Sequence, residues 1–442
     1  MTDLPRRLGV LCHGWPPAVG GVESLAHDLA CEFASRGHEL RVLCLDTSPE
    51  RGEDFVHKRE VTRGIVVDWI SYAYGDHERL ARQVRHERLE RIALEWVRHE
   101  CLPLVHLHHA TGFGLGVVNA IQTGGAAVLA HLHDHWPLCP RGQLWHVDGV
   151  ACPGPSPERC SDCVARTWPH LLPSQGAPAL GPTGEELADD KQACLHRTAF
   201  AIEMLRRADH RVACSESLAL RYARHGLEGV DALPNGVRAT ELAAEVALRR
   251  MEGERGEERV LGVLGAVQPS KGVLEFARAF VEARVPGWRL EVHGPLASYH
   301  GDDSYVQSVR RLAENSASLR ICGSYARDDL AALLARLDAV AVPSLWEEPS
   351  GLSAREAQAA GLTVFATAVG GLLELRAGGG DLHFLPPGDP AAWSRVLVES
   401  LGSDPQGDVT PRVRELGEMA DDLEQHYRIA LSSAARRDDG SL

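Results

Sequence analysis

A run of about 18 apolar residues, the length that a membrane-spanning helix needs, occurs nowhere in this 442-residue sequence. The first residues, MTDLPRRLGVLCHGW, hold only a short apolar stretch and do not indicate a secretory signal peptide. Basic residues are also in deficit, with 46 lysines and arginines against 61 acidic residues and a net charge of −15. This balance argues against a nucleic-acid partner and against wholesale electrostatic binding to membranes. We therefore expect a cytoplasmic protein with at most peripheral membrane contact.

What the sequence does contain is ordinary for a globular protein: 44% of its residues are apolar and 24% are charged. A chain of 442 residues is too long for one hydrophobic core, so its length predicts two domains. The eleven cysteines are an odd number, and in a reducing compartment we expect most of them to be thiols.

Short β-branched runs alternate with amphipathic helices in both halves of the chain, which predicts an α/β fold with parallel, doubly wound sheets. We expect strands at 8–12, 40–45, 104–109, 126–133 and 210–215, and again at 259–265, 288–294, 318–323, 339–344 and 363–367. The predicted domains are a Rossmann-like domain at 1–236 with a Cys-rich insert at 136–184, a second Rossmann-like domain at 237–410, and a helix within 411–442 that returns to the first domain. Ligands bind at the carboxyl ends of parallel strands, so the site is expected in strand-to-helix loops that face each other across a cleft.

The loop EEPSGLSARE, at 347–356, follows a predicted strand and opens a helix. Glu348 lies in the loop and Glu356 in the helix, while Ser350, Gly351 and Leu352 present backbone N–H groups at the helix N-terminus. Such a terminus attracts anions, and a glycine there lets a phosphate approach closely. A capped helix with ordinary acidic residues near its start explains the pattern equally well.

Two further loops follow the first strand of each half. Lys271, in GAVQPSKGV, lies just before a helix and can reach a diphosphate, although a single lysine is more often solvated surface. Gly20 and Gly21, in GWPPAVGGVES, allow the backbone to approach a ligand, although many tight turns look the same.

Histidines gather at the ends of two consecutive strands, in HLHHATG and HLHDHW. Strand alternation places His106 and His108 on one face, so these side chains can converge. The pattern fits a metal site, a catalytic pair or polar strand ends. We favour a sugar-contact or catalytic role for His133, because Asp134 and His135 are expected to point away from it.

Four cysteines, Cys139, Cys152, Cys160 and Cys163, lie within 25 residues of the Pro- and Gly-rich insert. The C-x2-C pair favours a structural zinc site, with an iron–sulfur cluster as the second choice and unliganded thiols as the alternative. The insert follows HLHDHW directly, so its expected role is to brace a loop over the cleft, with Arg141 and Trp145 touching the acceptor.

Taken together, the loops resemble the retaining glycosyltransferases of family 4, the glycosyl transferases group 1, which have the GT-B fold. The segments that carry the resemblance cover nearly the whole chain in the family's order: GGVESLAHDLACEFASRGHEL, CSESLALRYARHG, LPNGV, GAVQPSKGVLEFARAF and PSLWEEPSGLSAREAQAAGLTVFAT. The last of these resembles the family's E-x7-E signature and is the strongest. One departure is Ala266, where many members have an arginine that contacts phosphate.

The resemblance implies a role for each candidate residue. Glu348 would lie by the donor sugar and Glu356 would bind the ribose, while Gly351 and Leu352 hold the diphosphate and Lys271 neutralises it. Gly21 would approach the same phosphate and His133 the sugar. His108, His109 and Asp134 would lie on the acceptor side.

The implied function is transfer of a sugar from a nucleoside-diphosphate donor to an acceptor with retention of anomeric configuration, in polysaccharide, glycolipid or other glycoconjugate biosynthesis. The acceptor would be a glycan, a lipid-linked sugar or a small molecule, and catalysis would need no metal cofactor. Two alternatives remain open: a redox enzyme built on the four-cysteine cluster, and a non-catalytic sugar-binding module.

Overall fold

The computed structural model describes residues 4–17, 20–50, 52–75, 77–253, 256–402 and 412–439. The chain forms two compact units. The first consists of Met1–Val147, Cys152–Pro234 and Gly417–Leu442, and the second of Asp148–Ala151 and Asn235–Leu416. The division at 234/235 lies two residues from the domain boundary that the sequence predicts.

The first unit is built on one sheet with strand order β3-β4-β2-β1-β5-β6-β7-β8. Its strands are β1 (Arg7–Leu11), β2 (Glu39–Asp46), β3 (His57–Thr62), β4 (Ile65–Ser71), β5 (Leu104–Leu107), β6 (Ala127–Leu132), β7 (His210–Ala213) and β8 (Asp231–Ala232). β3 runs antiparallel to β4, and the other pairs of described strands are parallel. The predicted parallel sheet is therefore correct except at this edge, where the charged and exposed β3 was not anticipated.

The helices of the first unit follow the strands, as a doubly wound sheet requires. They are α1 (Gly21–Ser35), α2 (Glu87–Glu100), α3 (Val117–Thr123), α4 (Pro157–Thr167), α5 (Asp190–Arg207), α6 (Glu216–Arg224) and α13 (Leu416–Asp438), with 3-10 turns η1 (Leu80–Gln83), η2 (Pro169–Leu171) and η3 (Pro173–Gln175). Their apolar faces cover the buried strands, which are rich in valine, leucine and alanine.

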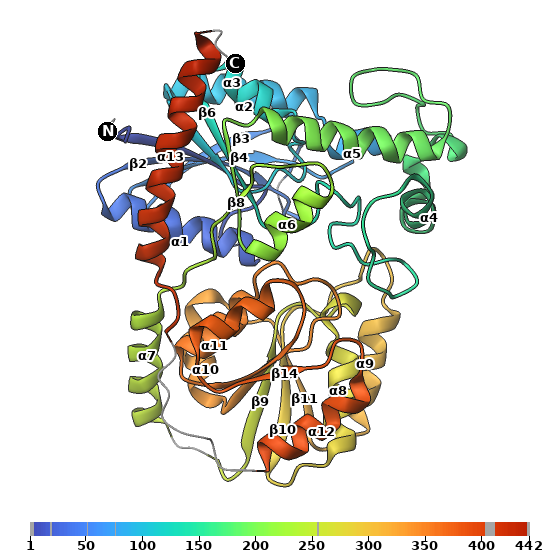
Figure 1. Cartoon of the computed structure of the whole chain (residues 1–442), viewed down its shortest axis with the longest axis vertical. Coiled ribbons are helices and arrows are strands. Elements are labelled where there is room, and N and C mark those ends of the chain that lie inside the picture. Colours follow the sequence, from blue (N-terminus) through green and yellow to red (C-terminus); the bar gives the residue numbers. More distant parts are fainter. Residues whose placement is uncertain are drawn as a thin grey trace. The chain divides into compact units, whose positions relative to one another are not determined.

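The C-terminal helix α13 packs on the first unit, beside α1 (Figure 1). The rings of Phe33 and Tyr427 are 5.3 Å apart, and Arg36 Nη1 lies 2.6 Å from an oxygen of Asp421. The helix α13 therefore belongs to the same unit as β1, although the second unit lies between them in the sequence.

The Cys-rich insert contains a helix that the sequence analysis did not foresee. In α4, Ser156 caps the N-terminus by accepting a hydrogen bond from the Arg159 N–H, and Pro157 occupies the first turn. Both are standard helix-start signals. The insert has a small core of its own, made of Leu80, Cys160, Val164, Leu171, Leu172, Leu187, Ala193 and Cys194.

The second unit has a parallel sheet with strand order β11-β10-β9-β12-β13-β14. Its strands are β9 (Arg259–Leu264), β10 (Trp288–His293), β11 (Leu319–Gly323), β12 (Ala339–Val342), β13 (Thr363–Thr367) and β14 (Leu382–Leu385). Its helices are α7 (Ala239–Glu252), α8 (Val273–Ala283), α9 (Ser304–Glu314), α10 (Leu330–Arg336), α11 (Leu352–Ala359) and α12 (Pro390–Leu401), with η4 (Pro269–Lys271), η5 (Arg327–Asp329) and η6 (Gly370–Gly378). This is the strand order of a nucleotide-binding Rossmann sheet.

Across the described residues, the helices include none with the length and hydrophobicity that a bilayer span demands.

Candidate active site

Both sheets reverse their winding direction at one position, between β1 and β5 in the first unit and between β9 and β12 in the second. In open α/β sheets, ligands bind outside the carboxyl ends of the strands at such a switch point. The loop after β9 carries Lys271 and the loop after β12 carries Glu348, while the loop after β5 carries His108 and His109. The fold therefore brings most sequence-predicted residues to the expected edges.

In the second unit, Lys271 and Glu348 form an ion pair. Lys271 Nζ donates to both carboxylate oxygens of Glu348, at 2.9 and 2.8 Å, and lies 5.1 Å from the centre of the Trp346 ring. The Glu348 side chain is 10% exposed, whereas that of Lys271 is 28% exposed. The lysine is therefore the more accessible partner for an incoming anion.

Other donors fix the Glu348 carboxylate in place. Ser344 Oγ donates to Oε2 at 2.7 Å and Trp346 Nε1 donates to the same oxygen at 2.9 Å. Burial opposes ionisation, but Lys271 and these donors hold the pKa of Glu348 below its ordinary value. Glu348 is therefore a preorganised carboxylate, and neither Ser344 nor Trp346 was singled out from the sequence.

The loop backbone between Glu348 and α11 depends on Gly351. Its φ of +73° lies in the left-handed region, and a Cβ there would come within 2.3 Å of Leu372 Cδ2. With Gly351 as the N-cap, α11 begins at Leu352, so its first N–H groups are in the position that the sequence predicts. Ser350 is buried, and its hydroxyl accepts a hydrogen bond from Asn235 Nδ2 at 3.0 Å.

Glu356 lies in α11, as predicted, but with a partner that the sequence did not reveal. Its buried carboxylate is paired with Arg327, which begins η5 after β11. Arg327 stands 29 positions earlier in the chain, and no local pattern connects the two.

At the position of the missing family arginine, Ala266 directly follows Gly265, whose φ is +133°.

In the first unit, two ion pairs lie side by side at the switch point. His13 Nε2 is 3.0 Å from Glu23 Oε1, and His109 Nε2 is 3.1 Å from Asp134 Oδ2. The rings of His13 and His109 have centroids 4.5 Å apart, which joins the two pairs. His109 and Asp134 were predicted from the sequence, whereas His13 and Glu23 were not, although His13 directly follows the strand predicted at 8–12.

These pairs hold charge in a buried setting. Burial would lower the pKa of His13, but hydrogen bonds, including the one with Glu23, raise it to about 9. Burial likewise opposes the charged form of His109, and Asp134 raises its pKa above the ordinary value. The His13 imidazole therefore favours the protonated state at neutral pH.

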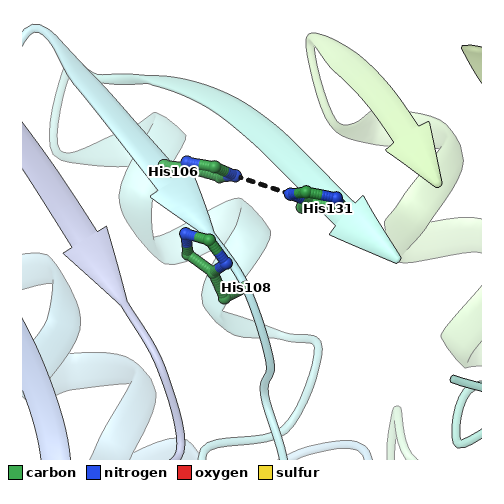
Figure 2. A group of neighbouring side chains, drawn as sticks. All are labelled: His106, His108 and His131. Carbon is green, nitrogen blue, oxygen red and sulfur yellow. Dashed lines mark hydrogen bonds between the residues drawn. The ribbon is translucent and has the colours of Figure 1, made fainter. Parts of the chain in front are cut away.

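The remaining histidines form a second, uncharged group. His106 Nε2 and His131 Nδ1 are 3.2 Å apart, and His108 Nδ1 and His133 Nε2 are 3.1 Å apart. Burial lowers the pKa of each of the four side chains. Figure 2 shows His106 and His131 on neighbouring strands with His108 beside them. The predicted convergence of His106 and His108 is confirmed, with ring centroids 3.8 Å apart.

Gly20 and Gly21 lie at the start of α1. Gly20 is the N-cap residue with an extended φ of −165°, and a Cβ there would lie 2.1 Å from Glu23 Oε2. Gly21 is the first residue of the helix and is exposed. Positions 18 and 19 of the same loop lie outside the described residues.

Arg141 and Trp145 are buried within the insert, and Arg141 Nη1 donates to the Trp145 carbonyl at 2.9 Å. They line one cavity of about 20 Å³ together with Cys139, Cys152, Cys160 and Cys163. All eleven cysteines of the chain are free thiols. Among the described residues, the sulfur atoms of the insert do not form a group of three within 4.8 Å. Metal binding by these cysteines stays a prediction.

Two family models match the chain. The model described as Glycosyltransferase Family 4 matches residues 19–241, and that described as Glycosyl transferases group 1 matches residues 258–403. The chain belongs to glycosyltransferase family 4. The first match covers half of the sequence and the glycine loop, and the second contains Lys271, Glu348 and Glu356.

Relatives of this family 4 chain include D-inositol 3-phosphate glycosyltransferases. The protein of Corynebacterium aurimucosum is 33% identical over 191 residues, which are 42% of this chain and 43% of the relative. That of Mycobacterium bovis is 40% identical over 128 residues, 28% of this chain and 26% of the relative. The chain thus spans less than half the length of these curated relatives.

Solved structures of the same architecture match over almost the full length. Sucrose-phosphate synthase from Thermosynechococcus elongatus has a TM-score of 0.61 at 18% identity, with 98% of this chain and 97% of that chain covered. Anabaena HepE in complex with UDP-glucose has a TM-score of 0.58 at 17% identity, with 99% and 100% covered. At these identities the likeness shows the fold alone, which is GT-B.

Proposed function

We propose that this chain is a glycosyltransferase that moves a sugar from a nucleoside-diphosphate donor to an acceptor hydroxyl, with retention of anomeric configuration. The observation that carries the proposal is the Lys271–Glu348 pair beside the N-terminus of α11, at the switch point of a Rossmann sheet. A lysine and a helix N-terminus both favour a diphosphate, and a fixed carboxylate nearby can accept hydrogen bonds from sugar hydroxyls.

The reaction breaks the bond between the anomeric carbon and the diphosphate oxygen and forms one to the acceptor oxygen. Negative charge grows on the leaving diphosphate, and Lys271 with the N–H groups of Gly351 and Leu352 opposes it. The acceptor proton goes to the leaving phosphate or to a nearby group. Because these residues supply the positive charge, the proposal needs no catalytic metal.

Glu356 binds the ribose of the donor in this proposal. Its carboxylate is already paired with Arg327, so the two ribose hydroxyls donate to an oxygen that Arg327 holds in place. The cation also offsets the repulsion between Glu356 and the diphosphate. Arg327 is thereby assigned a positioning role that the sequence did not suggest.

The first unit contributes the acceptor side and the glycine loop. His133 is assigned a contact with the reacting sugar; its Nε2 is engaged by His108, which leaves Nδ1 for the sugar. His109, Asp134, Arg141 and Trp145 are assigned to the acceptor side, and Gly20 with Gly21 to the phosphate.

The acceptor is a glycan, a lipid-linked sugar or a small molecule, and the product belongs to polysaccharide, glycolipid or other glycoconjugate biosynthesis. D-Inositol 3-phosphate enters the tests as one acceptor because relatives carry its name. The protonated His13 at the switch point suits an anionic acceptor of this kind. The free thiols and the net charge of −15 support a cytoplasmic location.

The decisive experiment is a screen of UDP-, GDP-, ADP- and dTDP-sugars, read as a thermal shift and as release of nucleoside diphosphate. At least one donor should raise the melting temperature and be hydrolysed slowly, and both effects should weaken in Glu356→Ala. A thermal shift without hydrolysis or transfer would favour the non-catalytic sugar-binding alternative. If no donor acts and Glu356→Ala changes nothing, the proposal fails, and iron in the purified protein would then favour a redox enzyme.

A further inference from the structure

We propose that His106, His108 and His131 bind one divalent transition-metal ion, with zinc as the expected metal. Each of the three offers a ring nitrogen, and these nitrogens all lie within 4.8 Å of one another. The three side chains come from β5, from the residue just after it and from β6, and each is about 98% buried (Figure 2). Imidazole nitrogen suits zinc, copper, nickel and iron far better than magnesium or calcium.

The closest pair already has the separation of two ligands on one ion. Zinc–nitrogen bonds of about 2.0–2.1 Å in a tetrahedral arrangement place two nitrogens roughly 3.3 Å apart. His106 Nε2 and His131 Nδ1 are 3.2 Å apart. The His108 nitrogen lies within 4.8 Å of both.

Two of these rings have a hydrogen-bond partner at their second nitrogen, as metal-ligating histidines usually do. A ligating histidine donates its second N–H to an outer partner, which fixes the tautomer and the ring orientation. His106 Nδ1 is 3.0 Å from the Tyr427 hydroxyl, and His108 Nδ1 is 3.1 Å from His133 Nε2. With the proton on Nδ1, the Nε2 of each ring is the ligating nitrogen, and in His106 this nitrogen faces His131 Nδ1.

Charge is also compatible with an ion. Burial lowers the pKa of the three histidines, so the rings are neutral, which is the ligating form. A water molecule would complete a four-coordinate site.

Hydrogen bonding alone leaves this cluster incomplete. His131 Nε2 is buried and has no hydrogen-bond partner. His131 therefore keeps one ring nitrogen, on the side away from His106, that the described hydrogen bonds do not use. The ion would join the ends of β5 and β6 and hold the His108–His133 pair, whatever reaction the chain catalyses.

The test is metal analysis of the purified full-length protein after incubation with zinc and dialysis, together with the absorption spectrum of the cobalt-substituted protein. We expect one histidine-bound equivalent of metal, beside any metal that the cysteines of the insert hold. It should be lost in His106→Gln and His131→Gln, and in the variant Cys160→Ser/Cys163→Ser the cobalt spectrum should be that of nitrogen and oxygen ligands without a thiolate charge-transfer band.

Two controls locate the metal. His426→Gln alters a partly buried histidine pair, His210 and His426, whose ring nitrogens are 2.8 Å apart and which forms a second candidate group with Asp231; the metal bound at His106, His108 and His131 should remain. The double variant Cys160→Ser/Cys163→Ser removes the thiol pair of the insert and should also retain the histidine-bound equivalent.

The proposal is overturned if the folded wild type holds less than about half an equivalent, or if metal persists in both histidine variants. A metal that is lost only in the cysteine variant, or that shows a thiolate band alone, also overturns it. Should either histidine variant fail to fold, the stoichiometry and cobalt spectrum of the wild type with the two controls decide the question.

Discussion

The two sheets of this protein both reverse their winding at one switch point, but they place opposite chemistry there. In the second unit, a partly exposed lysine and a buried glutamate form an ion pair beside a helix N-terminus. In the first unit, the corresponding edge holds two charged pairs beside four buried histidines whose pKa values are lowered. The fold places the candidate sites, and the loop side chains differ in charge, which is why we propose an anion as the ligand in one unit and hydroxyl groups or a metal ion in the other.

The largest expected effect is on the charged switch point. Lys271→Ala should lower kcat/KM for sugar transfer by about 100- to 1,000-fold, because it removes the cation that opposes charge on the leaving group. The measurement is steady-state kinetics with the donor that the screen identifies. Lys191→Ala, which removes an exposed lysine of α5, serves as the matched control and should be silent. A change of less than about threefold in Lys271→Ala would break the assignment of this edge to the diphosphate.

A second comparison sets the two glycine loops against each other. Gly351→Ala should lower the free energy of unfolding by about 1–3 kcal/mol, because its φ of +73° is strained for alanine and its Cβ would meet Leu372. Gly20→Ala should cost about 1 kcal/mol, because the residue is extended and unstrained but its Cβ would displace the Glu23 carboxylate that pairs with His13. Urea unfolding of both variants measures the difference, and equal losses would refute it.

The pH dependence of stability distinguishes the first unit. The pKa of His13 is raised to about 9 in the folded state from an ordinary value of 6.5, so its contribution is complete below pH 6.5 and is lost as the pH rises through 9. We expect about 1–3 kcal/mol from this source. The stability difference between wild type and His13→Gln should shrink between pH 6.5 and 9.5 in thermal or urea unfolding. A difference that stays constant over this range would show that the His13–Glu23 pair does not titrate there.

The smallest expected effect on stability is that of Arg327→Ala. Its guanidinium is 42% exposed, and ion pairs of this kind contribute about 0–1 kcal/mol. Donor KM should nevertheless rise severalfold, because Glu356 loses the partner that holds it. Thermal unfolding and donor titration together test this. A large stability loss with unchanged KM would make the pair structural.

Much of this architecture could be predicted from local patterns. The strands of both sheets begin and end within two residues of their expected positions wherever a β-branched run is flanked by turn residues, as at Thr363–Thr367. β3 was missed because its sequence, HKREVT, is charged and exposed and it is defined only by its pairing with β4. β4 was missed although IVVDWIS is a β-branched run, and the short strands β8 and β14 were not predicted either. α4 was missed because Pro and Gly residues surround it.

In the candidate site, too, local motifs could be predicted and contacts made by tertiary structure could not. Glu348, Glu356 and Lys271 belong to contiguous motifs and were found, whereas Arg327 reaches Glu356 only through the fold. The histidine contacts between β5 and β6 also depend on register, which a sequence does not fix: His106 lies beside Leu129 in the ladder, and its ring reaches His131 two residues further on. Isolated residues that meet through tertiary structure have no sequence signal of their own.

The position of α13 has a consequence for how the chain is synthesised. The Tyr427 hydroxyl in this helix is hydrogen-bonded to His106 of β5. This contact of an early strand therefore cannot form until a residue 321 positions later has been translated. The second unit, from Asn235 to Leu416 apart from one short loop, is nearly continuous and can be completed while the helix is still inside the ribosome. The unit that emerges first from the ribosome is therefore the one that is finished last.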